Sequence, residues 1–214
     1  MKNIIGTGNL DDLFLTYIYA KSQYPEFMYC HFNLHNEDWH SKFKEFLQEQ
    51  NQKFQIYEFD FETMKGYFPD FELIDFNKEY PITISDITLP NKKGALAKEN
   101  FNVQYTLVQI EHQNKKIEDI PSLRKAYKEL KFIGDEVNSK LKSYYNYSIY
   151  DKLYLIKHCS VFVGFESLYS YYAGLLGIPQ FIISESPQKY PKQWLPQIQF
   201  FKTETDLINH LKIN

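Results

Sequence analysis

Short apolar segments alternate with amphipathic segments through the first 60 residues of the chain. The expected strands cover residues 2–8, 27–33 and 53–61, and the expected helices between them cover 10–21 and 38–50. In the helical segments the apolar residues recur at the three- and four-residue spacing that gathers them on one face. A β-α-β-α-β order implies parallel strands joined by right-handed crossovers, so this part is predicted to form a Rossmann-like half.

The same alternation returns after an irregular stretch at 62–100, which prolines and glycines interrupt and in which one short strand is expected at 81–87. The predicted fold class is α/β with parallel sheets, in two Rossmann-like halves, 1–95 and 96–214, that face each other across a cleft. The later strands are expected at 102–110, 130–134, 160–165 and 180–184, and the later helices at 120–130, 136–145, 149–158, 167–176 and 203–211.

Charge and composition limit the partners and the location of the protein. The net charge is −3 and Arg124 is the only arginine, so stable binding to nucleic acid is not expected. No apolar stretch approaches the roughly 20 residues of a membrane span. No signal peptide is expected, because the first expected strand begins at residue 2. Cys30 and Cys159 are predicted to be buried thiols in a reducing compartment, which predicts a cytoplasmic protein. The aromatic share of 18% fits either a packed core or a homodimer interface.

Neither a metal ion nor a cofactor is expected. His31, His35 and His40 lie near one another in the sequence, but their spacing is not that of a zinc site. No second cluster of ligand residues completes them. The chain also contains no P-loop and no G-x-S-x-G nucleophile motif, which argues against those two kinds of active site.

Ligands of open parallel sheets bind beyond the carboxyl ends of the strands, and the loop after the first strand is one such place. Its glycines allow backbone amides to approach an anion or a sugar closely, and the following helix adds a partial positive charge. The alternative is that the acidic residues only cap that helix. The residues predicted to matter in this loop are Gly6, Thr7, Gly8, Asn9, Asp11 and Asp12.

The second half has three further candidate positions, each following an expected strand. A carboxylate there can accept hydrogen bonds from sugar or ribose hydroxyls, and a lysine can neutralise a phosphate. The alternatives are a first-turn acid, an N-cap residue and a solvated turn. The candidates are Glu166 with Ser167, Gly134 with Glu136, and Lys115 with Lys116.

Residues 166–179, ESLYSYYAGLLGIP, resemble a motif of the heptosyltransferase-like glycosyltransferases of family 9, which have the GT-B fold. The family motif begins D-[ST]-G-x-x-H. Glu166 stands at its acidic position and Ser167 at its hydroxyl position. Three positions depart from the motif: Glu166 replaces the usual aspartate, Leu168 replaces the glycine, and Tyr171 replaces the histidine.

The start of the chain resembles the same family, because GTGNLDD precedes an apolar helix and Asp12 falls on the family's aspartate. The resemblance implies a metal-independent, inverting transfer of a sugar from a nucleotide sugar to an acceptor that the sequence does not identify. In this reading Asp12 acts as the general base. The implied donor contacts are Glu136 and Glu166 to hydroxyls, and Ser167 with Lys115 or Lys116 to the diphosphate.

Two alternatives to a glycosyltransferase stay open. The replaced glycine and histidine favour a non-catalytic module that binds a nucleotide, a sugar or a partner protein. A sugar-nucleotide epimerase of the same shape would need further carboxylates, which the sequence does not locate. Binding of a nucleotide sugar without transfer or hydrolysis would distinguish the first alternative from the transferase.

Overall fold

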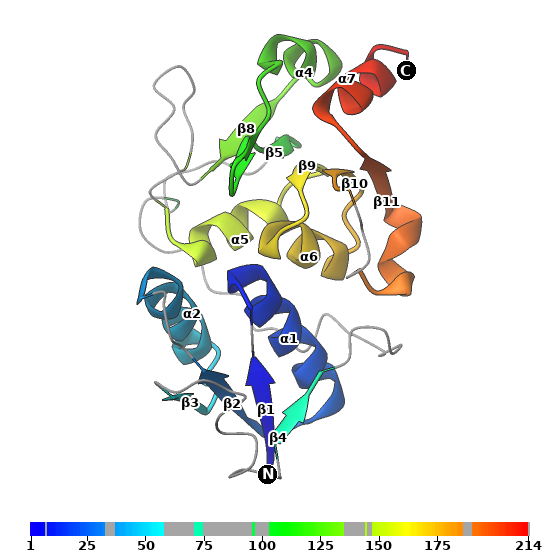
Figure 1. Cartoon of the computed structure of the whole chain (residues 1–214). Coiled ribbons are helices and arrows are strands. Elements are labelled where there is room, and N and C mark those ends of the chain that lie inside the picture. The colour runs from blue at the N-terminus through cyan, green and yellow to red at the C-terminus, as the bar shows by residue number, and fades with distance from the viewer. Residues whose placement is uncertain are drawn as a thin grey trace. The chain divides into compact units, whose positions relative to one another are not determined.

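The computed structural model describes residues 1–6, 8–32, 37–57, 71–74, 96, 103–134, 144, 147–185 and 190–213. They belong to two compact units, Met1–Leu89 and Pro90–Asn214, each with its own parallel sheet (Figure 1). The resemblance to family 9 implies that the first half, 1–95, lies on the acceptor side and that the second half, 96–214, binds the nucleotide sugar. Both roles stay predictions, as does the cleft between the halves.

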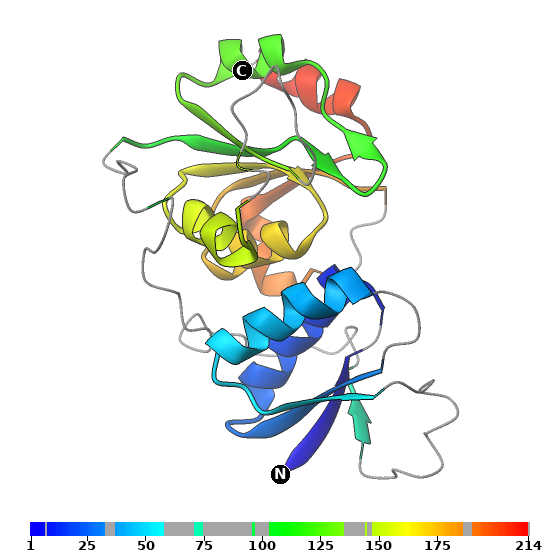
Figure 2. The ribbon, with the colours of Figure 1, turned by 90° about the vertical axis from the view of Figure 1, so that its left-hand side faces the viewer.

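The first unit contains a four-stranded sheet with the order β3-β2-β1-β4, and every strand pair in it is parallel. Helices α1 and α2 lie on one face of this sheet (Figure 2). The predicted β-α-β-α-β order is therefore confirmed. The elements are β1 Lys2–Gly6, α1 Leu10–Gln23, β2 Phe27–Phe32, α2 Glu37–Glu49, β3 Phe54–Tyr57 and β4 Phe71–Leu73.

Aromatic side chains form the core of this first unit. Tyr17 and Phe46 meet edge to face with their ring centroids 5.2 Å apart, and Phe14 lies at the same distance from Phe46. Tyr29 of β2 packs on Phe43 of α2 with a centroid separation of 5.3 Å. All five side chains are buried. The aromatic residues were expected to form either a packed core or a homodimer interface, and these five belong to the core.

The second unit contains a five-stranded parallel sheet with the order β11-β10-β9-β5-β8. Helices α4 and α7 lie on one face and helices α5 and α6 on the other (Figures 1 and 2). The elements are β5 Thr106–Gln109, β6 Glu111–His112, β7 Lys115–Lys116, α4 Ile120–Ala126, β8 Leu130–Ile133, α5 Ile149–Lys157, β9 Val161–Phe165, α6 Leu168–Leu175, β10 Gln180–Ile183, a 3-10 helix Lys192–Gln197, β11 Ile198–Phe201 and α7 Glu204–Ile213.

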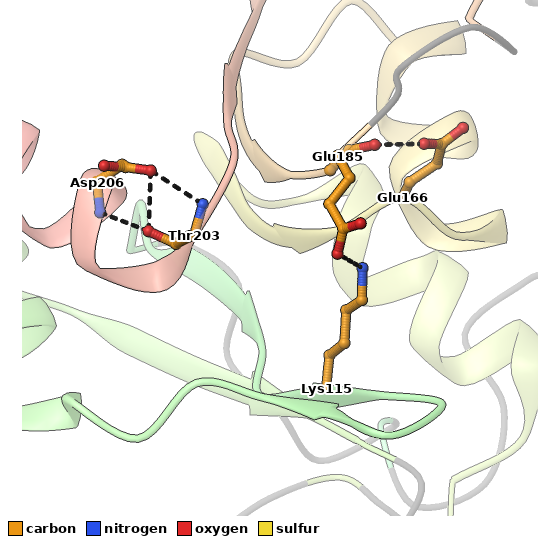
Figure 3. Close-up of polar contacts among 6 residues, drawn as sticks. Lys115, Glu166, Glu185, Thr203 and Asp206 are labelled. Atoms are coloured by element: carbon orange, nitrogen blue, oxygen red, sulfur yellow. Dashed lines mark hydrogen bonds and ion pairs between the residues drawn. The ribbon is translucent and has the colours of Figure 1, made fainter.

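Two predicted helix boundaries in this unit are confirmed. Thr203 caps α7, because its Oγ1 accepts the Asp206 amide at 3.2 Å while the Asp206 carboxylate accepts the Thr203 amide at 3.1 Å (Figure 3). Gly177 follows α6 with a φ of +72°, a left-handed conformation that stops a helix and favours glycine.

Several elements differ from the sequence-based expectation. Strands β4 and β11 were not expected, and Lys115 and Lys116 form one strand of a β-hairpin rather than a turn. The helix expected to reach residue 130 ends at Ala126, where the Tyr127 amide makes the last helical bond to Leu123. The expected strand at 81–87 and helix at 136–145 lie almost entirely outside the described residues.

Each unit carries one buried cysteine, as predicted. Cys30 lies on β2 and Cys159 precedes β9, and neither forms a disulfide. Burial raises the pKa of both thiols to about 12. Both are therefore protonated near neutral pH. None of the helices that the structure describes is long and apolar enough to cross a membrane.

Candidate functional site

The carboxyl ends of the second unit's strands bring several predicted residues to one edge of the sheet. Because all five strands are parallel, the segments that follow β5, β8, β9 and β10 leave the sheet at the same edge. We call the residues that follow these strands at this edge the strand-end site. It comprises Lys115 and Lys116 of the hairpin after β5, Gly134 after β8, Glu166 and Ser167 after β9, and Ser184 and Glu185 after β10.

Glu166 is the best-defined carboxylate of the strand-end site. Its Oε2 accepts a hydrogen bond from Ser184 Oγ at 2.7 Å (Figure 3), and its Oε1 accepts one from Tyr171 Oη at 3.1 Å. The side chain is partly exposed. Each carboxylate oxygen has two lone pairs, so both oxygens can accept a further hydrogen bond from a ligand hydroxyl.

Ser167 is the N-cap residue of α6 and is fully buried. Its amide donates to Ser170 Oγ at 2.9 Å, and its own hydroxyl donates to Gln109 Oε1 at 2.9 Å. This arrangement matches the alternative that Ser167 serves the helix terminus. The predicted contact between the Ser167 amide and a diphosphate would compete with the bond to Ser170, and it stays a prediction.

Gln109 is a buried polar residue that the sequence analysis did not single out. It lies on β5 beside Gly164 of β9, and a Cβ atom at Gly164 would come within 2.7 Å of the Gln109 Cβ. The missing side chain of Gly164 thus leaves the room in which the Gln109 amide reaches Ser167. The one sequence signal for Gln109 is that a glutamine ends the otherwise apolar strand TLVQ, and this signal does not indicate its partner.

The two hairpin lysines each face a carboxylate. Lys115 Nζ lies 3.3 Å from Glu185 Oε1, and both side chains are largely exposed (Figure 3). Lys116 Nζ lies 3.9 Å from Oε2 of Glu111, which is buried. An exposed ion pair contributes only about 0–1 kcal/mol, so the ammonium group of Lys115 can exchange Glu185 for another anion at low cost.

Gly134 and its surroundings contain a second residue that the sequence analysis missed. The Gly134 carbonyl accepts a hydrogen bond at 2.9 Å from Nζ of Lys152, a buried lysine on α5 that also lies 5.7 Å from the centre of the Tyr169 ring. A Cβ atom at Gly134 would come within 2.9 Å of Glu111 Oε1. The predicted neighbour Glu136 lies outside the described residues.

The predicted loop of the first unit forms a capping box at the start of α1. Asn9 Oδ1 accepts the Asp12 amide at 3.0 Å, and Asp12 Oδ2 accepts the Asn9 amide at 3.3 Å. Gly8 has a φ of +90°, which favours glycine. Asp12 therefore stabilises the helix terminus, as the alternative had it, and its role as a base stays a prediction. Asp11 is buried, and Thr7 lies outside the described residues.

Gly6 is required by packing inside the first unit. A Cβ atom there would collide with the hydroxyl of Tyr29 and come within 2.8 Å of Leu13 Cδ2. The Tyr29 hydroxyl donates to the Leu13 carbonyl at 3.0 Å, and burial holds the pKa of this phenol well above its usual range. The space that Gly6 leaves is thus occupied by Tyr29, and a ligand contact at Gly6 stays a prediction.

A metal site was not expected, and the described part of the chain shows no group of three or more His, Cys, Asp or Glu side chains that could hold an ion. The side chains of His31 and His40 and the whole of His35 are not among those described.

Comparison with known proteins gives a match at the level of structure. No sequence-family model and no curated protein matches the chain. Among solved structures, E. coli ADP-heptose lps heptosyltransferase II is similar, with a TM-score of 0.57 and 11% identity over 100% of this chain and 98% of that chain. The family 9 glycosyltransferase from Veillonella parvula gives a TM-score of 0.50 and 8% identity over 98% of this chain and 91% of that chain.

The fold is that of the heptosyltransferase-like glycosyltransferases of family 9. A further similar structure is the iron-containing dodecameric glycosyltransferase TibC of enterotoxigenic E. coli, with a TM-score of 0.51 and 15% identity over 94% of this chain and 62% of that chain. At these identities the likeness establishes the fold alone, and this fold is the one that the resemblance in the sequence implied.

Proposed function

We propose that this protein is a glycosyltransferase that moves a sugar from a nucleotide-sugar donor to an acceptor, with inversion at the anomeric carbon and without a metal ion. The observation that carries the proposal is the strand-end site. A partly exposed carboxylate, Glu166, and an exposed lysine, Lys115, lie at the carboxyl edge of one parallel sheet. The fold shared with heptosyltransferases supports the same reaction class.

The donor binds the second unit, and the charged side chains of the strand-end site determine the orientation of the donor. The carboxylate of Glu166 accepts hydrogen bonds from hydroxyl groups of the donor, whereas it repels phosphate oxygens. Lys115 and Lys116 attract the diphosphate, which displaces Glu185 from Lys115. Glu136, which comes three residues after β8 in the sequence, is proposed to accept a further hydrogen bond from a donor hydroxyl.

In the transfer step, the acceptor oxygen attacks the anomeric carbon from the side opposite the diphosphate. The bond between that carbon and the diphosphate oxygen breaks, and its electron pair stays on the leaving diphosphate. The acceptor proton passes to Asp12 as the new glycosidic bond forms. Lysine charges aimed at the departing diphosphate stabilise the transition state in the role that a metal ion has in other transferases.

Replacing Asp12 tests the proposed base. We expect Asp12→Asn to lower turnover by about 10²–10⁴-fold, the usual contribution of a general base, with little change in donor affinity. The measurement combines calorimetry with ADP-glucose, UDP-glucose, UDP-N-acetylglucosamine and GDP-mannose and a mass-spectrometric assay of hydrolysis and transfer with the donor that binds.

The matched control for Asp12 is Asp206→Asn. Asp206 has the same position in the capping box of α7 as Asp12 has in that of α1. Its replacement therefore removes a comparable capping hydrogen bond and leaves the proposed base in place. Unchanged turnover in Asp12→Asn would exclude Asp12 as the base. An equal loss in both variants would assign the effect to helix stability.

A non-catalytic binding module is the second candidate, and one observation favours it. The Ser167 amide donates to Ser170 Oγ, so the residue at the motif's hydroxyl position is already engaged within α6. A module of this kind would bind a nucleotide sugar of the same panel without hydrolysing or transferring it. Binding combined with absent turnover in the wild-type protein would therefore favour the module over the transferase.

A further inference from the structure

Two hydroxyl groups from two different elements hold the carboxylate of Glu166. Tyr171, on α6, donates to Oε1, and Ser184, at the end of β10, donates to Oε2. We propose that Tyr171 and Ser184 are positioning residues, which fix the direction in which Glu166 presents its remaining lone pairs to a ligand. The proposal rests on the proposed function only in taking that ligand to be a nucleotide sugar.

The packing of the second unit fixes where both hydroxyl groups lie. Tyr171 is 1% exposed and Ser184 is 7% exposed. The Tyr171 ring also packs edge to face on the Tyr190 ring, with the centroids 5.0 Å apart. Burial restricts the movement of both donors, so the carboxylate keeps one orientation as long as both bonds are made.

A fixed carboxylate binds a ligand better than a rotating one. Glutamate has several rotatable bonds, and a ligand that has to order them loses affinity because the side chain loses conformational entropy. Here the two hydrogen bonds order the side chain before a ligand arrives. An ionised carboxylate only accepts hydrogen bonds, so both hydroxyls are donors, and the free lone pairs select ligand groups that donate as well.

The competing explanation is purely structural. The two hydrogen bonds to Glu166 join the end of β9 to α6 and to the end of β10. They would stabilise the folded second unit whether or not a ligand binds. The two explanations differ in one respect. A positioning residue acts on the ligand through Glu166, so its replacement has no further effect on binding once Glu166 is absent.

The test is a double-mutant cycle on nucleotide-sugar binding. Tyr171→Phe is made in the wild-type protein and in Glu166→Ala, and affinity is measured by calorimetry for the member of the panel named above that binds. We expect Tyr171→Phe to weaken binding about tenfold in the wild type, which is close to the lower limit for a lost hydrogen bond to a charged group. In Glu166→Ala we expect no further loss. Ser184→Ala is expected to behave in the same way.

Tyr105→Phe is the matched control. It removes another buried tyrosine hydroxyl of the second unit, one that donates to the Leu155 carbonyl, and it should leave nucleotide-sugar affinity unchanged. Equal losses from Tyr171→Phe in the two backgrounds, or no loss in the wild type, would overturn the proposal.

A comparison of crystal structures supplies a readout that needs no ligand. In the Tyr171→Phe protein we expect the Glu166 carboxylate to turn or to occupy several orientations, and an unchanged carboxylate would refute a positioning role. If no member of the panel binds the wild-type protein, the proposed function fails, and this comparison still decides whether Tyr171 orients Glu166.

Discussion

At the scale of single residues, Gly6 shows how one missing methyl group sets the packing of the first unit. A Cβ atom at this position would collide with the Tyr29 hydroxyl and crowd Leu13. We expect Gly6→Ala to lower the free energy of unfolding by about 1–3 kcal/mol, the usual cost of overpacking a core. Denaturation in urea, followed by circular dichroism, measures this change.

Removing the Tyr29 hydroxyl should relieve part of that cost. In a Tyr29→Phe background we expect Gly6→Ala to be less destabilising than in the wild type, because the closest clashing atom is gone. The relief is only partial, since the Tyr29 ring and Leu13 remain near the added methyl group. An equal cost in both backgrounds would show that the collision with the hydroxyl does not determine the effect.

The sequence indicates some residues of the strand-end site and hides others. Glu166 could be predicted because a carboxylate that directly follows a buried strand has a defined position at the edge of a parallel sheet. The hydroxyls of Tyr171 and Ser184 could not be assigned to Glu166, because that requires the order of β9 and β10 in the sheet and the rotation of α6. The apolar periodicity of a single element predicts neither the order of the strands nor the rotation of the helix.

Gln109 and Lys152 were missed for a related reason. Both are polar residues within apolar segments, and their hydrogen-bond partners come from distant parts of the chain: the Ser167 hydroxyl for Gln109 Oε1 and the Gly134 carbonyl for Lys152 Nζ. Burial of a polar side chain depends on such a partner, and pairs of this kind cannot be read from a single sequence.

At the scale of elements, the start of α4 depends on one carboxylate. Asp119 caps this helix, with its Oδ1 accepting the Ser122 amide at 3.1 Å and its Oδ2 accepting the Ser122 hydroxyl at 2.6 Å. These bonds to Ser122 lower the pKa of Asp119 in the folded protein below its ordinary value of 3.8. They favour the ionised form, so the cap is weakened when the carboxylate takes up a proton.

The pH dependence of stability should reveal this cap. The pKa of Asp119 is lower in the folded protein than its ordinary value of 3.8. The contribution of this carboxylate to the free energy of unfolding is therefore fully present above pH 3.8 and is lost as the pH falls through the lower, folded pKa. We expect the urea midpoint of the wild type to fall more steeply with acidification below about pH 4 than that of Asp119→Asn. Parallel curves for the two proteins would contradict the prediction.

Strong periodicity predicted the long elements well and the short ones poorly. Helices α1 and α2 and strand β9 lie within a few residues of their expected bounds, because each has a continuous apolar pattern. Strand β4 has three residues and each strand of the hairpin has two, so neither is long enough to show alternation. Their strand pairing is decided by neighbours in the sheet or hairpin, which the local sequence does not contain.

At the scale of the whole molecule, the two buried thiols can report on the two units separately. Cys30 lies in the first unit and Cys159 in the second, and burial raises the pKa of both to about 12. We expect neither to react with Ellman's reagent at pH 8 while the protein is folded, since the thiolate is the reactive form.

Single-cysteine variants extend this observation to unfolding. In Cys159→Ser the remaining thiol reports the first unit, and in Cys30→Ser it reports the second. We expect the two thiols to become reactive at different urea concentrations, because each unit has its own sheet and core and can unfold as a unit. A single shared midpoint would mean that the two units unfold in one cooperative step.

The position of β5 inside its sheet, between β8 and β9, has a consequence for synthesis on the ribosome. Its four buried residues pair with β8 on one side and β9 on the other, with Thr106 aligned to Leu130 and to Val161. The nascent chain emerges amino terminus first, so β5 leaves the exit tunnel before either partner strand has emerged. Until β9 has left the tunnel as well, this apolar segment has unpaired backbone groups on at least one side, and in that interval it is a target for chaperones and for aggregation with other nascent chains.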